Sequence, residues 1–218
     1  MQKFYSIIIP VYNEASSIPK LLSLLKQYSL NGHEIIIVDD GSNDGSKSIL
    51  KKCDFIKLIS LKNNCGKGIA LKNGLIASKN NKTIIFDGDL ELNPNEIVKL
   101  MILNDNSESI FATRYNKITL SSFWNLGNLF LTTLFNFING SNVKDALCCA
   151  KTFYKSNINL KKLSAKKFNI DIEIAGQLVK KNNIKNILIK YNRRNKEEGK
   201  KLRFRDGFSI IFQIIKDK

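Results

Sequence analysis

The stretch KTIIFDGDLELNP, residues 82–94, joins a short apolar run to three acidic residues at alternate positions: Asp87, Asp89 and Glu91. An apolar run of this length, followed by polar residues and a glycine, is typical of a buried β-strand that ends where the acids begin. The whole chain holds 35 Lys and Arg against 19 Asp and Glu, so three carboxylates here run against its overall charge. The stretch therefore predicts a strand of a buried sheet with a polar site at its carboxyl end.

Similar apolar runs alternate with helical patterns through the first half of the chain. Strands are predicted at residues 4–10, 34–40, 55–61 and 82–89, with helices between them at 15–29, 44–53 and 66–80. Strands that are apolar almost throughout and alternate with helices predict an α/β fold, with a mostly parallel sheet covered on both faces. Ligands of such sheets bind outside the carboxyl ends of the strands. Five acids would line that edge: Glu14, Asp39, Asp40, Asp87 and Asp89.

The second half of the chain contains one uncharged segment, residues 118–143, which is rich in Phe and Leu. Its Asn side chains argue against a bilayer span, so it is expected to form a core helix, or a helix that touches lipid or an apolar acceptor. Further elements are predicted as strands at 109–115, 146–154 and 184–191, a helix at 171–182, a basic loop at 192–206 and a helix ending at Lys216. No repeat or linker is seen, so residues 1–218 are expected to form one domain, which 43% hydrophobic content can supply with a core.

Positive charge is concentrated in the last third of the chain. Residues 151–218 hold 19 Lys and Arg against 6 Asp and Glu, whereas residues 1–100 hold 13 against 10. A basic region of this kind suits phosphates or an anionic membrane surface. A lysine-rich solvated surface, or a patch that binds nucleic acid, would also explain it.

Cysteine and histidine usage excludes two kinds of site. Cys53, Cys65, Cys148 and Cys149 have no CxxC spacing and His33 is the only histidine, so neither a Cys/His metal site nor a Ser/His/Asp triad is expected. Cys148 and Cys149 are expected to be small buried residues of a strand. The apolar run near the N-terminus is too short for a signal peptide, which predicts a reducing, cytoplasmic location.

Carboxylates two residues apart on an extended chain point to the same face, so Asp87 and Asp89 would repel each other unless a cation lies between them. Mg²⁺ or Mn²⁺ that bridges a diphosphate explains the pair, although the acids could also merely cap a helix near Pro94. Neither a P-loop nor a GxGxxG pattern is present. Asp39 and Asp40 could instead accept hydrogen bonds from a base and a ribose, while the glycines that follow form a turn and Asp44 caps a helix.

The segments IIIPVYNE, IIIVDDGSNDGS, GKGIALKNGL, FDGDLELNP and ATRY, in this order, resemble the nucleotide-sugar half of a family 2 glycosyltransferase. The nearest subgroup resembles the dolichol-phosphate mannosyltransferase type. The resemblance continues through GNLFLTTLFNFING, DALCCAKTFYK, FNIDIEIAGQL and YNRRNKEEGKKLRFRDG. It implies a GT-A fold, with a nucleotide-sugar half at residues 1–115 and an acceptor-side half at 116–218. The implied reaction is an inverting transfer of a sugar from a nucleoside diphosphate.

The resemblance also carries family roles onto matching positions. It implies that the nucleotide sugar is bound by Pro10, Tyr12, Glu14, Asp39, Asp40, Lys67, Asp87, Gly88, Asp89, Arg114, Arg194 and Lys201. Within this set, Asp87 and Asp89 would bind the divalent cation, with Glu91 as a weaker third ligand. Arg114, Arg194 and Lys201 would hold donor or acceptor phosphates, for which guanidinium groups are well suited, and Arg193 is a neighbouring candidate.

The acceptor decides whether a catalytic base is needed. A phosphate monoester is already anionic and needs none, whereas a hydroxyl acceptor would need Asp145, Asp171 or Glu173 as the base. Asp171 and Glu173 could instead form the polar first turn of a helix. In either case the metal held by Asp87 and Asp89 would neutralise the charge of the leaving diphosphate, and Arg194 would hold phosphates. Asp145 is followed by Ala146, Leu147 and Cys148 where relatives usually carry an acid and a threonine, so a polar contact to the acceptor is expected to be missing.

Three functions remain open from the sequence. The first is transfer of a hexose or N-acetylhexosamine to a polyprenyl (dolichyl or undecaprenyl) phosphate, by a protein held peripherally on the cytoplasmic membrane face. The second is transfer to a sugar hydroxyl in polysaccharide or glycolipid assembly. The third, a non-catalytic basic protein that binds nucleic acid, leaves the acidic strand ends unexplained.

Overall fold

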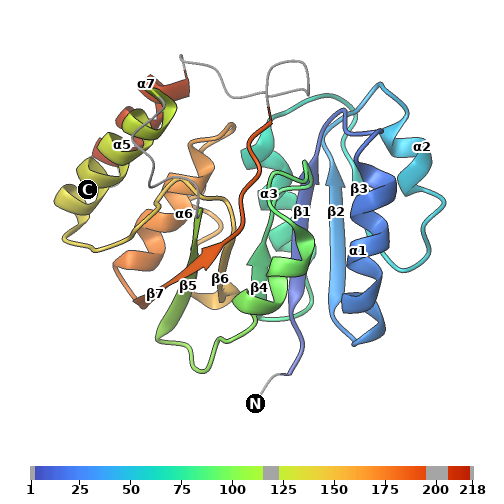
Figure 1. Cartoon of the computed structure of the whole chain (residues 1–218), viewed down its shortest axis with the longest axis horizontal. Helices are drawn as coiled ribbons and strands as arrows, with labels where there is room; N and C mark the ends of the chain where they lie inside the picture. Colours follow the sequence, from blue (N-terminus) through green and yellow to red (C-terminus); the bar gives the residue numbers. More distant parts are fainter. Residues whose placement is uncertain (1–2, 115–122, 195–205, 217–218) are drawn as a thin grey trace.

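The structure of the protein is a computed structural model that describes residues 3–114, 123–194 and 206–216. It contains one sheet of seven strands in the order β3-β2-β1-β4-β6-β5-β7 (Figure 1). The strands are β1 Ser6–Val11, β2 Glu34–Asp39, β3 Lys57–Ser60, β4 Lys82–Ile85, β5 Glu108–Arg114, β6 Lys151–Tyr154 and β7 Asn183–Ile189. Among these strands only β6 runs against its neighbours. The prediction of a mostly parallel sheet is confirmed.

Helices cover both faces of this sheet. They are α1 Ile18–Leu30, α2 Ser46–Leu50, α3 Lys67–Ala77, η1 Pro94–Glu96, α4 Ile97–Leu100, α5 Phe123–Asn139, η3 Lys155–Asn157, α6 Ile170–Val179 and α7 Asp206–Lys216. One core forms where α1, α2 and α4 pack on Ile7 and Ile9 of β1, and the other where α3, α5, α6 and α7 face the side of Ile8. Since both faces of β1 are buried, its sequence is apolar without alternation.

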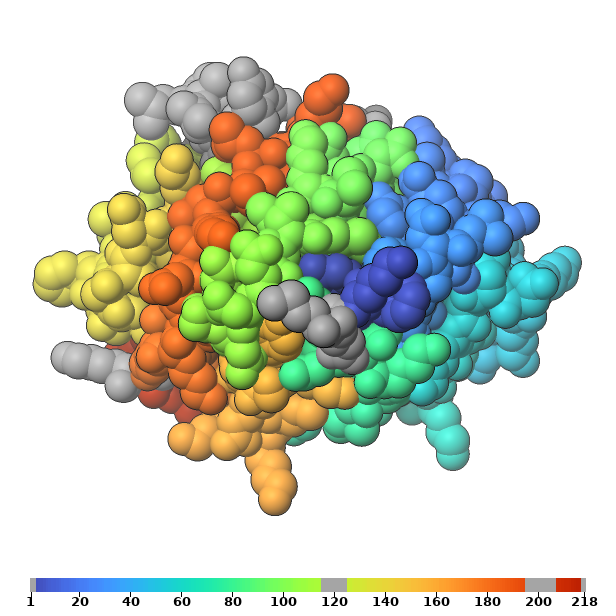
Figure 2. Space-filling view, turned by 90° about the horizontal axis from the view of Figure 1, so that it is seen from below, coloured from blue at the N-terminus to red at the C-terminus, as the bar shows by residue number. Residues whose placement is uncertain are grey.

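The strand order places the site. Strand β1 lies between β2 and β4 in the sheet, so the chain leaves β1 for one side and later returns to the other. The carboxyl ends of these three parallel strands meet at the upper edge in Figure 1. A crevice forms at such a point because the connections on its two sides diverge. Figure 2 shows the molecule from below, on the side away from this edge, where the parallel strands begin. The start of the chain, in dark blue, lies near the middle of this view.

Several predicted strands are shorter in the structure: the one at 82–89 ends at Ile85 and the one at 55–61 spans only Lys57–Ser60, but the largest difference is at β6. Residues 146–154 were predicted to be extended, but β6 begins only at Lys151. The buried ammonium of Lys151 donates to the carbonyl oxygens of Ala146 and Cys148, which holds the preceding residues in a turn. Cys148 and Cys149 are buried, as predicted, but they lie in this turn and not in a strand. The sequence pattern could not reveal the turn because an apolar run suits both structures.

Candidate active site

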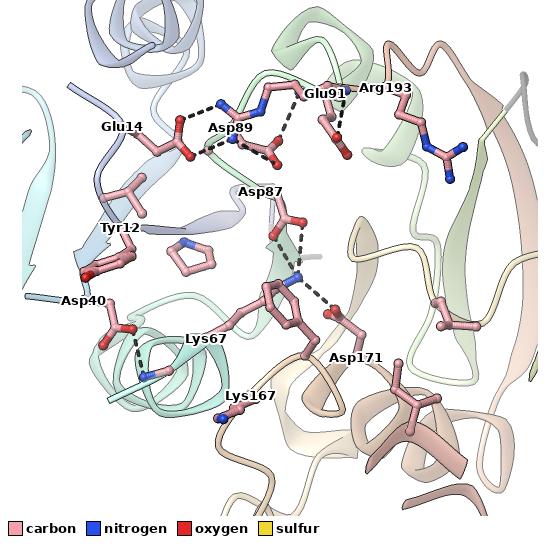
Figure 3. Close-up of a pocket in the computed structure, with 18 of the residues that line it drawn as sticks. Tyr12, Glu14, Asp40, Lys67, Asp87, Asp89, Glu91, Lys167, Asp171 and Arg193 are labelled. Atoms are coloured by element: carbon pink, nitrogen blue, oxygen red, sulfur yellow. Dashed lines mark hydrogen bonds and ion pairs between the residues drawn. The ribbon is translucent and has the colours of Figure 1, made fainter. Parts of the chain in front are cut away.

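A cleft of about 780 Å³ opens at the carboxyl ends of β1, β2 and β4 (Figure 3). The predicted site residues that line it are Pro10, Tyr12, Glu14, Asp40, Lys67, Asp87, Gly88, Asp89, Glu91, Arg114, Asp171, Arg193 and Arg194. The structure thus brings together residues from both halves of the chain. Asp39, Asp145 and Glu173 are not among the described residues that line the cleft, and Lys201 lies outside the described residues.

The acidic loop after β4 is held in a tight turn. Leu90 has a φ of 63°, and the Asp89 carboxylate accepts a hydrogen bond of 3.0 Å from the amide of Glu91. A side chain at Gly88 would come within 2.6 Å of Val11, so this position requires glycine for the loop to pack on β1. The loop therefore presents the carboxylates of Asp87 and Asp89 to the cleft.

Lys67, the first residue of α3, lies between two carboxylates. Its Nζ is 2.9 Å from Oδ1 and 3.1 Å from Oδ2 of Asp87, and 2.8 Å from Oδ2 of Asp171. Burial lowers the pKa of Lys67, but the charges of Asp171 and Asp87 outweigh it and raise this pKa well above its ordinary value. For Asp87, burial raises the pKa, but the Lys67 ammonium and a hydrogen bond with the Cys149 thiol lower it overall. Lys67 and Asp87 are therefore a charged pair.

Asp89 is in a different electrostatic position. Burial, and then the negative charges of Asp87 and Glu91, raise the pKa of Asp89 to about 7, although Arg194 and the Glu91 amide oppose this. A carboxylate that is buried beside two other acids ionises more readily when a cation is bound near it. The loop therefore favours binding of a cation near Asp89.

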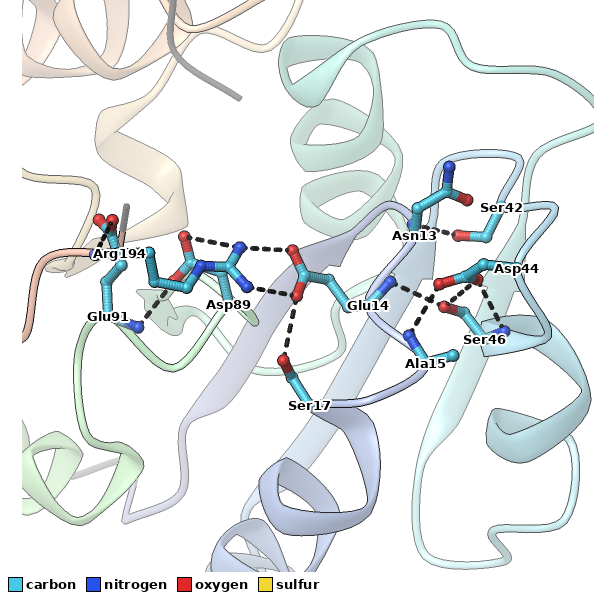
Figure 4. A network of polar contacts seen from close by, with 10 residues as sticks. All are labelled: Asn13, Glu14, Ala15, Ser17, Ser42, Asp44, Ser46, Asp89, Glu91 and Arg194. Carbon is cyan, nitrogen blue, oxygen red and sulfur yellow. Dashed lines mark hydrogen bonds and ion pairs between the residues drawn. The ribbon is translucent and has the colours of Figure 1, made fainter. Parts of the chain in front are cut away.

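Arg194 crosses the cleft and pairs with Glu14 (Figure 4). Its guanidinium donates two hydrogen bonds of 2.9 and 2.8 Å to the Glu14 carboxylate, and its Nη2 lies 3.9 Å from Asp89. The backbone amide of Arg194 donates a further bond of 2.9 Å to Glu91. Glu14 also accepts from the hydroxyl of Ser17. Arg194 thus spans the predicted base pocket and the predicted metal site.

Arg114, at the end of β5, is fixed by Asp145. The guanidinium donates bonds of 2.8 and 3.0 Å to the two oxygens of this fully buried carboxylate, and it lies 5.2 Å from the centre of the Tyr191 ring. The prediction of Asp145 as a candidate base needs correction, because the carboxylate is buried and bonded on both oxygens. Asp145 instead positions Arg114 in the cleft.

Glu173 needs the same correction. Its carboxylate accepts bonds from the amides of Ser164 and Ala165, at 2.9–3.0 Å, and is 4% exposed as a residue. It therefore anchors the loop before α6, in keeping with the view of Glu173 as part of a polar first turn. Asp171, also in that turn, is the predicted base that lines the cleft, and it is paired with Lys67.

The two acids at the carboxyl end of β2, Asp39 and Asp40, accept hydrogen bonds that hold neighbouring loops in place. Asp40 accepts bonds of 2.8 Å from the amides of Cys65 and Gly66, which ties β2 to the start of α3. Burial is the main cause of the raised pKa of Asp40. Asp39 is fully buried and accepts a bond of 3.1 Å from the amide of Ser42, so a contact with a base or ribose would require rearrangement. The predicted turn is present, since Asp44 accepts from the amide of Ser46 at the start of α2.

Some cleft residues were missed by sequence reasoning. Tyr191 reaches the acidic loop by a bridge to Leu92, and Phe168 lies with its ring centre 5.9 Å from the Lys67 ammonium. Lys167 also lines the cleft. Tyr191 and Phe168 lie in the segments YNRR and FNIDIEI, which carry the family resemblance, but only the charged residues of these segments were considered. Aromatic residues in a segment of this kind are the signal that could have identified them.

The residues present suit a divalent cation that is completed by its ligand. No group of three or more His, Cys, Asp or Glu side chains in the described part of the chain is arranged to hold a metal on its own. Mg²⁺ and Mn²⁺ are often held by one or two carboxylates, with water and substrate phosphates filling the other positions. Asp87 and Asp89 offer two carboxylates in a cleft that also contains Arg114 and Arg194, so the donor set fits a cation bound with a phosphorylated ligand.

The fold and this site together define a glycosyltransferase of the GT-A type. The family model described as glycosyl transferase family 2 matches residues 6–160. The chain therefore belongs to glycosyltransferase family 2, which confirms the family resemblance of its sequence. The family match favours the two enzyme hypotheses over a basic protein that only binds nucleic acid.

Similar proteins have related names. An undecaprenyl-phosphate 4-deoxy-4-formamido-L-arabinose transferase of Edwardsiella ictaluri is 30% identical over 72% of this chain and 50% of its own length. A protein of the same name from Pseudomonas savastanoi pv. phaseolicola is 36% identical over 51% of this chain and 35% of its own length. The chain thus spans half or less of the length of these relatives.

A solved structure supports the fold. The glucosyl-3-phosphoglycerate synthase of Mycobacterium tuberculosis, in complex with UDP, superposes with a TM-score of 0.73. Its identity to this chain is 15%, and the match covers 99% of this chain and 80% of that one. The same enzyme has also been solved with Mn²⁺, UDP and its product, with a TM-score of 0.68. The predicted GT-A fold is confirmed by this likeness.

Proposed function

We propose that the protein transfers a sugar from a nucleoside-diphosphate sugar to a polyprenyl phosphate, with Mg²⁺ or Mn²⁺ as cofactor. The observation that carries this proposal is the pairing of charges in the cleft. Two carboxylates, Asp87 and Asp89, face the same space as the cationic side chains of Lys67, Arg114 and Arg194. The carboxylates can bind a divalent cation, and the cationic side chains can bind the diphosphate that accompanies it.

The state of the candidate bases supports a phosphate acceptor. Asp171 is the predicted base that lines the cleft, and its carboxylate is engaged in an ion pair with the Lys67 ammonium. Asp145 and Glu173 hold other parts of the protein. A phosphate monoester needs no deprotonation before it attacks, so it suits a cleft whose predicted base is already held in an ion pair. The names of the relatives, which specify undecaprenyl phosphate, support the same acceptor class.

An exposed apolar surface supports a lipid acceptor. Helices α5 and α7 pack side by side at one end of the molecule (Figure 1), and both contribute to the cleft. Their outer side chains include Leu126, Leu129, Phe130, Phe208, Phe212 and Ile215, all of which are at least 47% exposed. We call these six residues the α5–α7 apolar surface. Exposed apolar side chains on two adjacent helices favour contact with a partner or a membrane.

This surface would place the cleft at a membrane. None of the helices in the described ranges has the length and hydrophobicity to cross a bilayer. We propose peripheral contact instead, with the α5–α7 apolar surface against lipid and the basic last third of the chain near anionic head groups. The side of contact would be the cytoplasmic face. Within the described part of the uncharged segment, Phe135 of α5 packs in the core, while the outer side chains of α5 would meet lipid.

The residues of the cleft would carry out a single inverting displacement. Arg114 and Arg194 would hold the phosphates of the donor and acceptor, and Tyr12 would cover the base. The divalent cation, when bound by Asp87 and Asp89, would supply positive charge to the departing diphosphate. The acceptor oxygen would attack the anomeric carbon from the side opposite the diphosphate, which inverts the configuration. The transferred sugar is a hexose or N-acetylhexosamine in this proposal.

The donor and acceptor can be tested separately. Thermal-shift measurements with UDP-, GDP- and dTDP-sugars, each with Mn²⁺ or with a chelator, should identify one nucleotide that stabilises the protein only with the metal. The labelled donor is then offered with undecaprenyl phosphate or with a soluble saccharide. Label that enters the organic-extractable lipid supports the proposal. Label that enters only the saccharide would refute the lipid acceptor and favour transfer to a sugar hydroxyl, with Asp171 as the base.

A further inference from the structure

Each acid of the loop after β4 already has a partner within the protein. Asp87 has the Lys67 ammonium on both of its oxygens, at 2.9 and 3.1 Å. Asp89 accepts the amide of Glu91 and has the Arg194 guanidinium 3.9 Å away. Glu91 in turn accepts the amide of Arg194. The cation that the sequence requires between these carboxylates is therefore supplied, in this structure, by the basic side chains of the protein.

Lys67 is held firmly in this position. Its side chain is 11% exposed and is bonded from two sides, by Asp87 and by Asp171. The backbone around it is also fixed, since the amide of Gly68 donates a bond of 2.9 Å to the carbonyl of Lys166. A side chain at Gly66 or Gly68 would come within 2.3 Å of a backbone oxygen, so the start of α3 and the loop before α6 pack in direct contact. The backbone that carries Lys67 is therefore fixed, and two ion pairs hold its ammonium in the cleft.

A dication and an ammonium compete for the same carboxylate. An ion on Asp87 would lie within a few ångströms of Lys67, where like charges repel strongly in a partly buried site. The diphosphate of a donor brings negative charge that offsets both cations at once. Asp171 provides a second partner, so Lys67 keeps one ion pair when the metal takes an oxygen of Asp87.

We propose that Lys67 is an internal counter-ion, which holds the place of the divalent cation on Asp87 until the donor diphosphate arrives. The cation then binds tightly only together with the nucleotide. This inference rests on the metal site of the proposed function and adds the order in which its ligands bind. Lys67 is a positioning residue in this account, because its effect on the reaction passes through Asp87 and the metal.

Direct metal binding tests the inference without any turnover. Free Mn²⁺ is measured by electron paramagnetic resonance during titration of the protein, first alone and then with saturating UDP or GDP. In the wild-type protein, Mn²⁺ should bind weakly alone and at least about tenfold more tightly with the diphosphate. The Lys67→Met variant, which keeps the side-chain length but not the charge, should bind Mn²⁺ alone at least about tenfold more tightly than wild type. The conservative Lys67→Arg variant should behave as wild type.

A second variant should change the affinity for Mn²⁺ in the opposite direction. Asp171→Asn leaves the ammonium paired with Asp87 alone, so nucleotide-free Mn²⁺ binding should become weaker than in wild type. This result keeps the inference testable if Lys67→Met fails to fold, which circular dichroism would reveal. An unchanged nucleotide-free affinity in both Lys67→Met and Asp171→Asn would overturn the inference.

The outcome also separates this inference from the proposed function. If wild-type protein and the variants all fail to bind Mn²⁺ with or without UDP and GDP, the metal site itself is refuted, and the counter-ion role with it. If Mn²⁺ binds with the diphosphate but its affinity is the same in the wild-type protein and the Lys67→Met variant, only the counter-ion role is refuted. Neither result depends on the acceptor or on the transferred sugar.

Discussion

Replacement of Asp89 by Asn should stabilise the metal-free protein while it removes metal-dependent donor binding. The pKa of Asp89 is raised from an ordinary value of 3.8 to about 7, chiefly by burial and next by the charges of Asp87 and Glu91. The folded state therefore favours the protonated acid. The stabilisation that results from the raised pKa of Asp89 is fully present below pH 4 and is lost as the pH rises to about 7. Above pH 7 the ionised carboxylate destabilises the fold, and an amide would not.

The size of the effect follows from the shift. A rise of about 3 pKa units corresponds to about 4 kcal/mol at most, since one unit is about 1.4 kcal/mol. The Asp89 side chain is 28% exposed, so solvent screening reduces the expected gain to about 1–2 kcal/mol. For a chain of this length, each kcal/mol raises Tm by about 2–4 °C. Asp89→Asn should thus raise Tm by about 2–8 °C at pH 8.

The assay is thermal unfolding in the presence of a chelator, at pH 8 and at pH 5. The gain should shrink at pH 5, where Asp89 of the wild-type protein is already protonated in the folded state. Asp54→Asn, which removes an exposed carboxylate elsewhere, should change Tm little at either pH. With Mn²⁺ and the donor nucleotide, the wild-type protein should gain Tm and the Asp89→Asn variant should not. A loss of stability at pH 8, or an equal gain at both pH values, would refute the reasoning.

Further predictions concern packing and the membrane. Arg114→Gln leaves the fully buried carboxylate of Asp145 without its ion pair, so urea denaturation should show a loss of about 3–5 kcal/mol, much of it recovered when Asp145 is also replaced by Leu. Gly68→Ala places a methyl group 2.0 Å from a backbone carbonyl oxygen, so it should lower Tm and weaken Mn²⁺–nucleotide binding in the same titration. Phe212→Asp, at a residue 69% exposed on α7, should reduce binding to anionic lipid vesicles at least about tenfold, as sedimentation would measure. Leu30→Asp, at a residue 78% exposed on α1, should leave vesicle binding unchanged.

The sequence was informative where function depends on local pattern. The apolar runs and the acids that follow them were sufficient to predict the parallel sheet and the edge that carries the cleft. Both depend on the local pattern of apolar and polar residues, which can be read along a single segment. The sequence could not show which carboxylates face the cleft. Asp145 lies 31 residues from its partner Arg114, and Asp171 lies 104 residues from Lys67, so their pairing depends on how distant elements pack.

The charge pairs also explain why the two halves of the chain need each other. Residues 1–115 supply Glu14, Asp87 and Asp89, and the second half supplies Arg194 to two of these acids. The second half also supplies a carboxylate to the first half, since Asp171 pairs with Lys67. Without the second half, the acids after β1 and β4 would lose a cation and Lys67 a carboxylate. Ion pairs between the two halves are what the prediction of a single domain over residues 1–218 would require.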